Sequence, residues 1–209
     1  MTDALLDRWN ALLARCGATA DPEPYGRDLL ARWAEPQRRY HAVGHLRAVL
    51  DHVDALAPLA ADADAVRLAA WFHDAVYRPD RSENEERSAQ LAVRALREAG
   101  LAEESVQEVA RLVRLTAGHD CAAGDRNGEV LCDADLAILG SAPERYAAYA
   151  AEVREEYAFV PEDAFRAGRA AILRQLLALP ALYRTAQARD RFDAAARTNL
   201  ASELSRLES

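Results

Sequence analysis

Side chains that could bind a metal ion occur at three places in this sequence. His73 and Asp74 follow the apolar stretch AAWF at 69–72, His45 lies earlier in the segment RRYHAVGHL, and Asp135 lies later in CDADLAILG. A carboxylate inside an apolar segment needs a partner, because an unpaired charge is costly to bury. A divalent cation would supply that partner; the alternative is that His73 and Asp74 mark a helix end that meets solvent.

The mixture of imidazole and carboxylate groups indicates which ions would suit such a site. Borderline ions such as Mn, Fe, Co, Ni or Zn accept both types of ligand, whereas Mg and Ca prefer oxygen alone. We therefore expect a divalent transition metal, with Mg disfavoured as the sole ion. A bound ion of this kind lowers the pKa of its water and polarises a phosphoryl oxygen. The chemistry favoured by these residues is hydrolysis of a phosphate ester.

The order of these residues resembles the HD superfamily of metal-dependent phosphohydrolases. The match extends from about residue 25 to 204 and follows one subfamily of predicted phosphohydrolases through the segments RRYHAVGHL, WFHDAVY, NEERSAQLA, TAGHD, CDADLAILG, VREEY and ARTNLASEL. This resemblance implies an HD-domain fold with four metal ligands: His45, His73, Asp74 and Asp135.

Two aspartates compete for the last ligand position. Asp133 and Asp135 are about 200° apart around a helix, so they cannot both face one ion. In the family pattern the ligand aspartate follows a small residue and precedes a leucine-rich turn, as Asp135 does. We expect Asp135 to bind the metal and Asp133 to cap the helix or orient a ligand.

A second metal would need further ligands. Some HD subfamilies place an additional histidine at the start of the helix that begins here with NEERSA, where this chain has Asn84. Glu85 and Glu86 could replace it or act as general base for the water, although Glu85 could instead form a capping box with Ser82. His119 could be a second ligand, a general acid for the leaving group, or a loop residue.

Five residues near the ligand motifs are candidates for substrate binding: Arg38, Arg39, Arg78, Tyr40 and His41. The planar guanidinium of arginine donates two parallel hydrogen bonds, which suits a phosphate group. Tyr40 and His41 lie about one helical turn before His45 and could line the pocket, or His41 could pack beneath it.

The elements that must position these residues are predicted to be helices. Ala, Leu, Arg and Glu are abundant, and apolar residues recur at helical spacing without sustained period-2 alternation. We expect one all-α HD-type domain over residues 1–209, with roughly eight to ten helices and with Trp33, Trp71 and Phe72 in the core. The metal-site core would cover about 38–140, and C-terminal helices over 143–209 would pack on it.

Composition narrows the possible partners. The chain of 209 residues contains 26 arginines and no lysine, which excludes a Schiff-base lysine and a P-loop lysine. Its net charge of -8 argues against a generic nucleic-acid binder. No apolar run approaches the roughly 18 residues of a membrane span. Three widely spaced cysteines suit the reducing cytoplasm. Self-association into a homo-oligomer stays open.

These observations predict a cytoplasmic metal-dependent phosphohydrolase that acts on a small phosphorylated compound, such as a phosphate ester or nucleotide. The alternatives are a di-iron oxygenase of HD type, a non-catalytic sensor of nucleotide or phosphate, and a helical scaffold. The loop at 119–129 has two glycines and could either close over the pocket or stay open.

Overall fold

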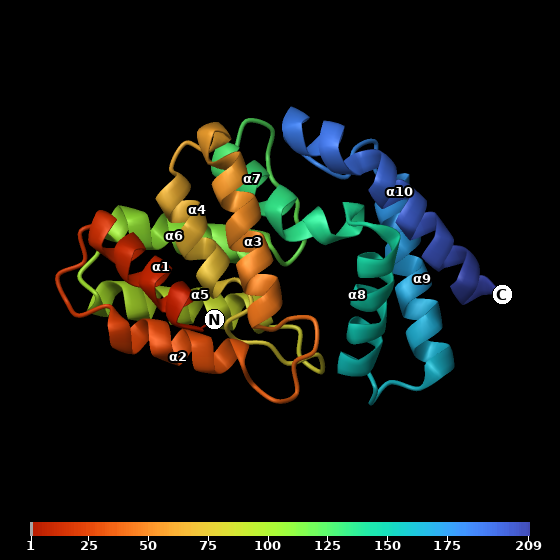
Figure 1. Ribbon diagram of the computed structural model, residues 1–209, viewed down its shortest axis with the longest axis horizontal. Helices are drawn as coiled ribbons and strands as arrows, with labels where there is room; N and C mark the ends of the chain where they lie inside the picture. The colour runs from red at the N-terminus through yellow and green to blue at the C-terminus, as the bar shows by residue number, and fades with distance from the viewer. Residues whose placement is uncertain (1) are drawn as a thin grey trace. The chain divides into compact units, whose positions relative to one another are not determined.

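Helices account for all regular secondary structure in residues 2–209, the part of the chain that the computed structural model describes (Figure 1). Within this range there are ten α-helices and two short 3-10 helices, so the all-α prediction is confirmed. No helix in the same range is both long and apolar enough to cross a lipid bilayer. The chain forms two units, which divide between Ala134 and Asp135.

The first unit contains seven α-helices and one 3-10 helix. Their bounds are α1 (Thr2–Arg15), α2 (Glu23–Trp33), α3 (Val43–Leu56), η1 (Ala57–Leu59), α4 (Ala63–Phe72), α5 (Asn84–Glu98), α6 (Glu103–Leu115) and α7 (Arg126–Asp135).

Helix α4 lies at the centre of this unit, in contact with α1, α3, α5 and α6 (Figure 1). Its sequence ADAVRLAAWF is apolar around most of its circumference, as expected of a helix that is covered on several sides. The side chain of Asp62 caps its start by accepting hydrogen bonds from the amides of Asp64 and Ala65. At its other end Trp71 and Phe72 pack edge-on against Trp9 of α1. The predicted core positions of Trp33, Trp71 and Phe72 are confirmed.

The two ends of helix α5 differ in how well the sequence predicts them. The predicted capping box between Ser82 and Glu85 is wrong, because Glu83 occupies the N-cap position and no side chain caps this end. The sequence indicates the other end through Gly100, which has a φ of +84°, a left-handed conformation that glycine adopts without strain. The amide of Leu101 then donates to the carbonyl of Leu96, which closes a typical helix C-terminus.

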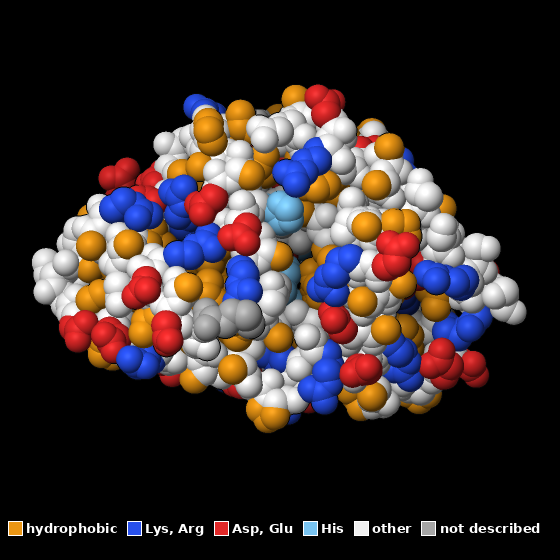
Figure 2. All heavy atoms as spheres, viewed as in Figure 1, with side chains coloured by type: hydrophobic (Ala, Val, Ile, Leu, Met, Phe, Trp, Pro, Cys, Tyr) orange, Lys and Arg blue, Asp and Glu red, His pale blue; other side chains and the backbone are white. Residues whose placement is uncertain are grey.

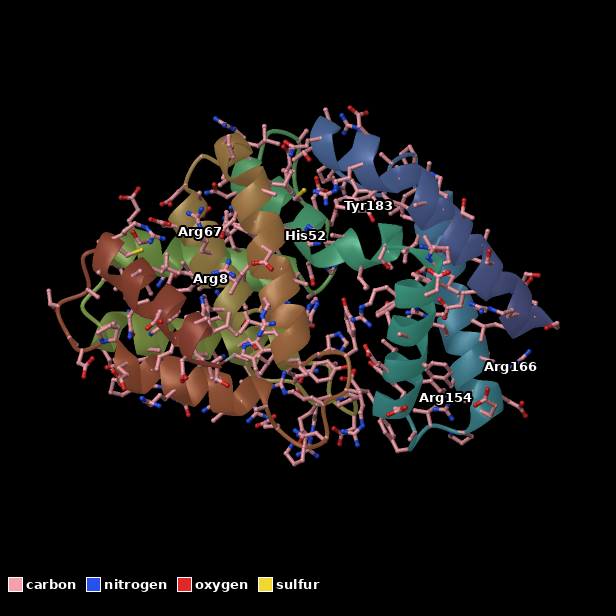
Figure 3. The ribbon with its side chains drawn as sticks, in the orientation of Figure 1. Arg8, His52, Arg67, Arg154, Arg166 and Tyr183 are labelled. Carbon is pink, nitrogen blue, oxygen red and sulfur yellow. The ribbon has the colours of Figure 1, made fainter. Side chains whose placement is uncertain are left out.

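Ion pairs join α1, α3 and α4 on the surface of the first unit. Arg8 and Arg67 lie close together and both bind Asp54 (Figure 3). Arg67 also binds Asp64, which in turn binds Arg15. Cationic and anionic side chains therefore alternate over this surface (Figure 2). Exposed pairs of this kind stabilise a fold by about 0–1 kcal/mol each.

The second unit consists of η2 (Leu136–Gly140), α8 (Pro143–Glu156), α9 (Glu162–Ala178) and α10 (Ala186–Glu208). Helix α10 packs against α9 and η2, and α8 packs against η2. Arg154 connects the end of α8 to the start of α9 by binding Glu162 and the carbonyl of Tyr157 (Figure 3).

A buried polar cluster occupies the interior of this second unit. Arg169 of α9 binds Glu203 of α10 at 2.8 Å, and the Tyr146 hydroxyl of α8 donates to the same carboxylate at 2.5 Å. Burial alone would raise the pKa of Glu203, but the Arg169 guanidinium outweighs it and holds that pKa below its usual value. The cluster thus joins all three long helices of this unit.

Candidate metal centre

Two buried imidazole rings face each other in the first unit. His45 belongs to the first turn of α3, and His73 is the residue at which α4 ends. Their Nε2 atoms are 3.2 Å apart, and the two residues are 5% and 1% exposed. Because both rings are almost completely removed from water, their nitrogens must find partners within the protein or in a bound ion.

Asp74 lies beside this histidine pair. Its Oδ2 atom is 3.3 Å from Nε2 of His73 and 3.9 Å from Nε2 of His45. The backbone turns directly after α4, where the amide of Ala75 donates to the carbonyl of Phe72. Two consecutive residues thereby direct their side chains to one point, as the predicted chelation by His73 and Asp74 requires.

Asp135 completes the group. It is the last residue of α7, so the preceding residues of this continuous helix fix its place. One of its carboxylate oxygens and one ring nitrogen each from His45 and His73 all lie within 4.8 Å of one another. Asp133 is almost fully buried but is not a member of this group. Of the two aspartates weighed from the sequence, Asp135 is the one beside the histidines.

The geometry can be tested against the requirements of a single ion. Bonds from a transition metal to nitrogen or oxygen are about 2.1 Å long, so two ligand atoms on one ion lie at most about 4.2 Å apart. The three distances among His45, His73 and Asp74 are 3.2, 3.3 and 3.9 Å and all satisfy this limit. These three donors therefore fit one divalent transition-metal ion, and Asp135 lies within the wider limit of 4.8 Å from the two histidines.

The orientation of His73 also fits a ligand role. Its Nδ1 atom is 2.9 Å from the carbonyl oxygen of Ala70, one turn earlier in α4. A carbonyl can only accept, so Nδ1 carries the hydrogen and the neutral ring has its lone pair on Nε2. Metal-binding histidines commonly donate their second ring nitrogen in this way. Without an ion, the same arrangement allows a hydrogen bond from His45 to His73.

Aromatic side chains surround the histidine pair. The Tyr40 ring is 4.7 Å from the ring of His45 and is buried, and the His41 ring is 5.7 Å from it. His41 stacks on Tyr77 at 4.2 Å. Tyr40 and His41 thus lie next to His45, the proposed ligand.

The three arginines predicted to bind substrate have different surroundings. Arg38 has a side-chain exposure of 0% and donates to backbone carbonyls, so a phosphate could not reach its guanidinium without rearrangement. Arg39 is exposed, and its Nη1 donates to the carbonyls of Pro36 and Arg38. Arg78 is exposed and pairs with Asp80. Arg39 and Arg78 keep the accessibility that a phosphate clamp needs, whereas Arg38 does not.

The predicted general acids and bases lie outside the ligand group. Glu86 is exposed and binds Arg114 of α6 at 2.6 Å. The hydrogen bonds from Arg114 and then Gln90 lower the pKa of Glu86 to about 2, which makes it a poor general base near neutral pH. Glu85 is half-buried in the first turn of α5, and His119 follows α6 with a φ of +50°.

Residues that the sequence analysis did not assign to the site hold the segments on both sides of His73 and Asp74 in place. The Trp33 indole donates to the carbonyl of Trp71 at 3.0 Å. The Ser88 hydroxyl accepts from the amide of Val76 and donates to its carbonyl. Asn84 accepts from the amide of Arg78 and donates to two carbonyls in the same loop. The signal for Asn84 and Ser88 was present in NEERSA, as polar residues four apart on one face of a helix.

No protein-family model matches the chain, and comparisons with the curated proteins and with the solved structures also give no match. The resemblance to the HD superfamily therefore stays a prediction that rests on the sequence motifs. The functional argument depends on the residues of the site.

Proposed function

We propose that the chain is a metal-dependent phosphohydrolase of HD type that acts on a small phosphorylated compound. In this proposal His45, His73, Asp74 and Asp135 hold one divalent transition-metal ion. The observation that supports it most is the pair of buried Nε2 atoms at 3.2 Å with a carboxylate oxygen beside them. A bound ion would supply a water of lowered pKa and an electrophile for the phosphoryl oxygen.

The role of the surrounding residues would be to orient the metal-binding histidines. The Ala70 carbonyl holds the His73 ring with its lone pair toward the ligand group. Tyr40 packs against His45 and Trp33 packs near His73, with ring centroids 4.7 and 5.4 Å apart. These two aromatic rings would keep water away from the buried faces of the imidazoles and hold both imidazoles in place before a substrate binds.

Charge and accessibility support the proposed class of substrate. Arg39 and Arg78 are exposed cations in the segments that carry His41 and Tyr77, and each could bind a phosphate oxygen. The acidic net charge of the chain favours a small phosphorylated compound over a nucleic acid. A cytoplasmic location is part of this proposal, because three widely spaced cysteines suit a reducing compartment.

Metal content of the protein purified without chelators or a histidine tag tests this proposal. Elemental mass spectrometry should find about one transition-metal ion per chain, which His73→Ala and Asp135→Ala should both lose. His52→Ala is the matched control, because His52 also belongs to α3 but is outside the ligand group. The loaded protein should then release phosphate from p-nitrophenyl phosphate or from members of a panel of nucleotides and sugar phosphates.

Each alternative has its own outcome in this experiment. Two irons per chain with uptake of dioxygen would favour the oxygenase, and one metal with tight phosphate binding but no turnover would favour a sensor. A wild-type protein that takes up no Mn, Fe, Co, Ni or Zn after reconstitution would contradict the proposed hydrolase.

A further inference from the structure

Arg38 is a buried cation whose donors are directed at the protein backbone. Its side chain has an exposure of 0%, and a guanidinium so placed needs partners within the protein. Its Nη1 donates to the carbonyls of Asp74 at 2.7 Å and His41 at 3.0 Å, and its Nη2 donates to the carbonyl of Ala75 at 3.2 Å. Its Nε binds the Glu35 carboxylate at 3.2 Å.

Two of the carbonyls that Arg38 binds, those of Asp74 and Ala75, lie in the turn that follows α4. Buried backbone carbonyls need hydrogen-bond donors, and a cationic side chain can supply them. The two consecutive carbonyls of Asp74 and Ala75 match the planar fork of an arginine, which a lysine ammonium does not reproduce. The guanidinium is also held over the rings of Trp33 and Tyr77, at 5.4 and 5.6 Å from their centroids.

Through these contacts Arg38 joins the two segments that carry the histidine pair. Nη1 bridges the carbonyl of His41, four residues before His45, and the carbonyl of Asp74. The His73 ring is oriented separately, by the carbonyl of Ala70. The peptide that follows Asp74 is therefore held by Arg38, and the direction of the Asp74 carboxylate depends on that peptide.

We propose that Arg38 is a positioning residue that directs the Asp74 carboxylate toward His45 and His73. This inference rests on the proposed function, because it assigns Arg38 to the assembly of the metal site. It replaces the phosphate-binding role that the sequence suggested for Arg38 with a role at the backbone.

Two measurements on the full chain test this role. The first is amide hydrogen exchange of Ala75 and Val76 in metal-free protein, which reports whether the turn after α4 is held. The second is Mn²⁺ affinity by calorimetry. Arg38→Met should speed the exchange of these amides at least about tenfold and weaken Mn²⁺ binding by about 10–100-fold, the usual effect of losing a group that orients a metal ligand. Arg38→Lys should not restore either value.

Arg67→Met is the matched control. Arg67 belongs to α4 and binds Asp54 and Asp64, but it does not contact the turn at 73–76. This variant should lose surface ion pairs and keep wild-type exchange at Ala75 and wild-type Mn²⁺ affinity. If Arg38→Met does not fold, the same two measurements are made on Arg38→Lys.

The possible results separate this inference from the proposed function. If wild-type protein binds Mn²⁺ and both Arg38 variants bind it equally well, only the role of Arg38 is refuted. Unchanged exchange at Ala75 in these variants would refute it as well. If wild-type protein binds no transition metal, the proposed function fails and the positioning role fails with it.

Discussion

Asn84 offers a direct test of how the segment after the candidate ligands is held. In NEERSA this residue stands where the resemblance to some HD subfamilies places a histidine, and the structure shows it anchoring a loop instead. Its amide group accepts from the backbone N–H of Arg78 at 3.0 Å and donates to the carbonyls of Arg78 and Arg81 at 2.9 and 3.2 Å. Asn84 is 6% exposed, so little water is available to replace these bonds.

The expected cost of Asn84→Ala follows from these three hydrogen bonds. Each contributes about 1 kcal/mol, so the loss should lower the free energy of unfolding by about 3 kcal/mol. For a chain of this length that corresponds to a fall in Tm of roughly 6–12 °C. Gln90→Ala is the control on the same helix, since Gln90 is exposed and donates one hydrogen bond, to Glu86. It should change stability by less than about 0.5 kcal/mol.

Urea denaturation of both variants, together with hydrogen exchange at the Arg78 amide, would measure this effect. We expect faster exchange at Arg78 in Asn84→Ala alone, because the acceptor of that amide is removed. Equal stability of Asn84→Ala and Gln90→Ala would refute the anchoring role. If Asn84→His instead gained a second metal ion without loss of stability, Asn84 would be a replaceable ligand position.

Three further predictions concern charge and metal binding. Arg169→Met should destabilise the protein by about 3–5 kcal/mol, because it leaves Glu203 buried without its cation, whereas Arg169→Met combined with Glu203→Leu should recover most of that loss in urea denaturation. Because the pKa of Glu203 is lowered in the folded protein, its ionised carboxylate contributes fully to stability above the unfolded-state pKa of about 4.3, and this contribution is lost as the pH falls below that value. Wild type should therefore lose more stability than the double variant between about pH 5 and about pH 3. Glu86→Gln should leave metal content and phosphate release within about twofold of wild type, and a loss of a hundredfold or more would restore the general-base role. Mn²⁺ at about 100 times its Kd should stabilise wild type by about 2.7 kcal/mol and His73→Ala not at all, as read from Tm in the presence and absence of the ion.

The sequence was sufficient for the parts of the fold that depend on local patterns. Helical spacing of apolar residues predicted the all-α class, and Gly100 marked the end of α5. Apolar residues at helical spacing over 131–139 predict a single helix there, whereas the structure has the end of α7 followed by η2. The same spacing predicts a last helix from about 192, but α10 begins at Ala186, because Thr185 caps it by accepting from the amide of Ala188. Such boundaries depend on single hydrogen bonds that composition does not reveal.

Within the site, residue type was a better guide than proximity in the sequence. His45 and His73 come from different helices and still meet, as the ordered motifs suggested. Arg38 lies near the same motifs, but its role depends on which way its side chain turns after α2, and it turns toward the backbone. The Glu85 capping box failed for a similar reason, since the first turn of α5 is fixed by Asn84 and its loop contacts.

In the proposed function, a bound cation would balance the charges that the ligand group brings together. Two carboxylates, Asp74 and Asp135, lie in partly buried positions beside two imidazoles that are almost fully buried. Removing carboxylates from water costs free energy, which a bound cation would offset. A helix end would not need this arrangement, because one solvent-exposed polar residue would suffice. The Ala70 carbonyl holds the His73 ring in one orientation, and a ligand held in advance by its surroundings is what a site built to bind an ion requires.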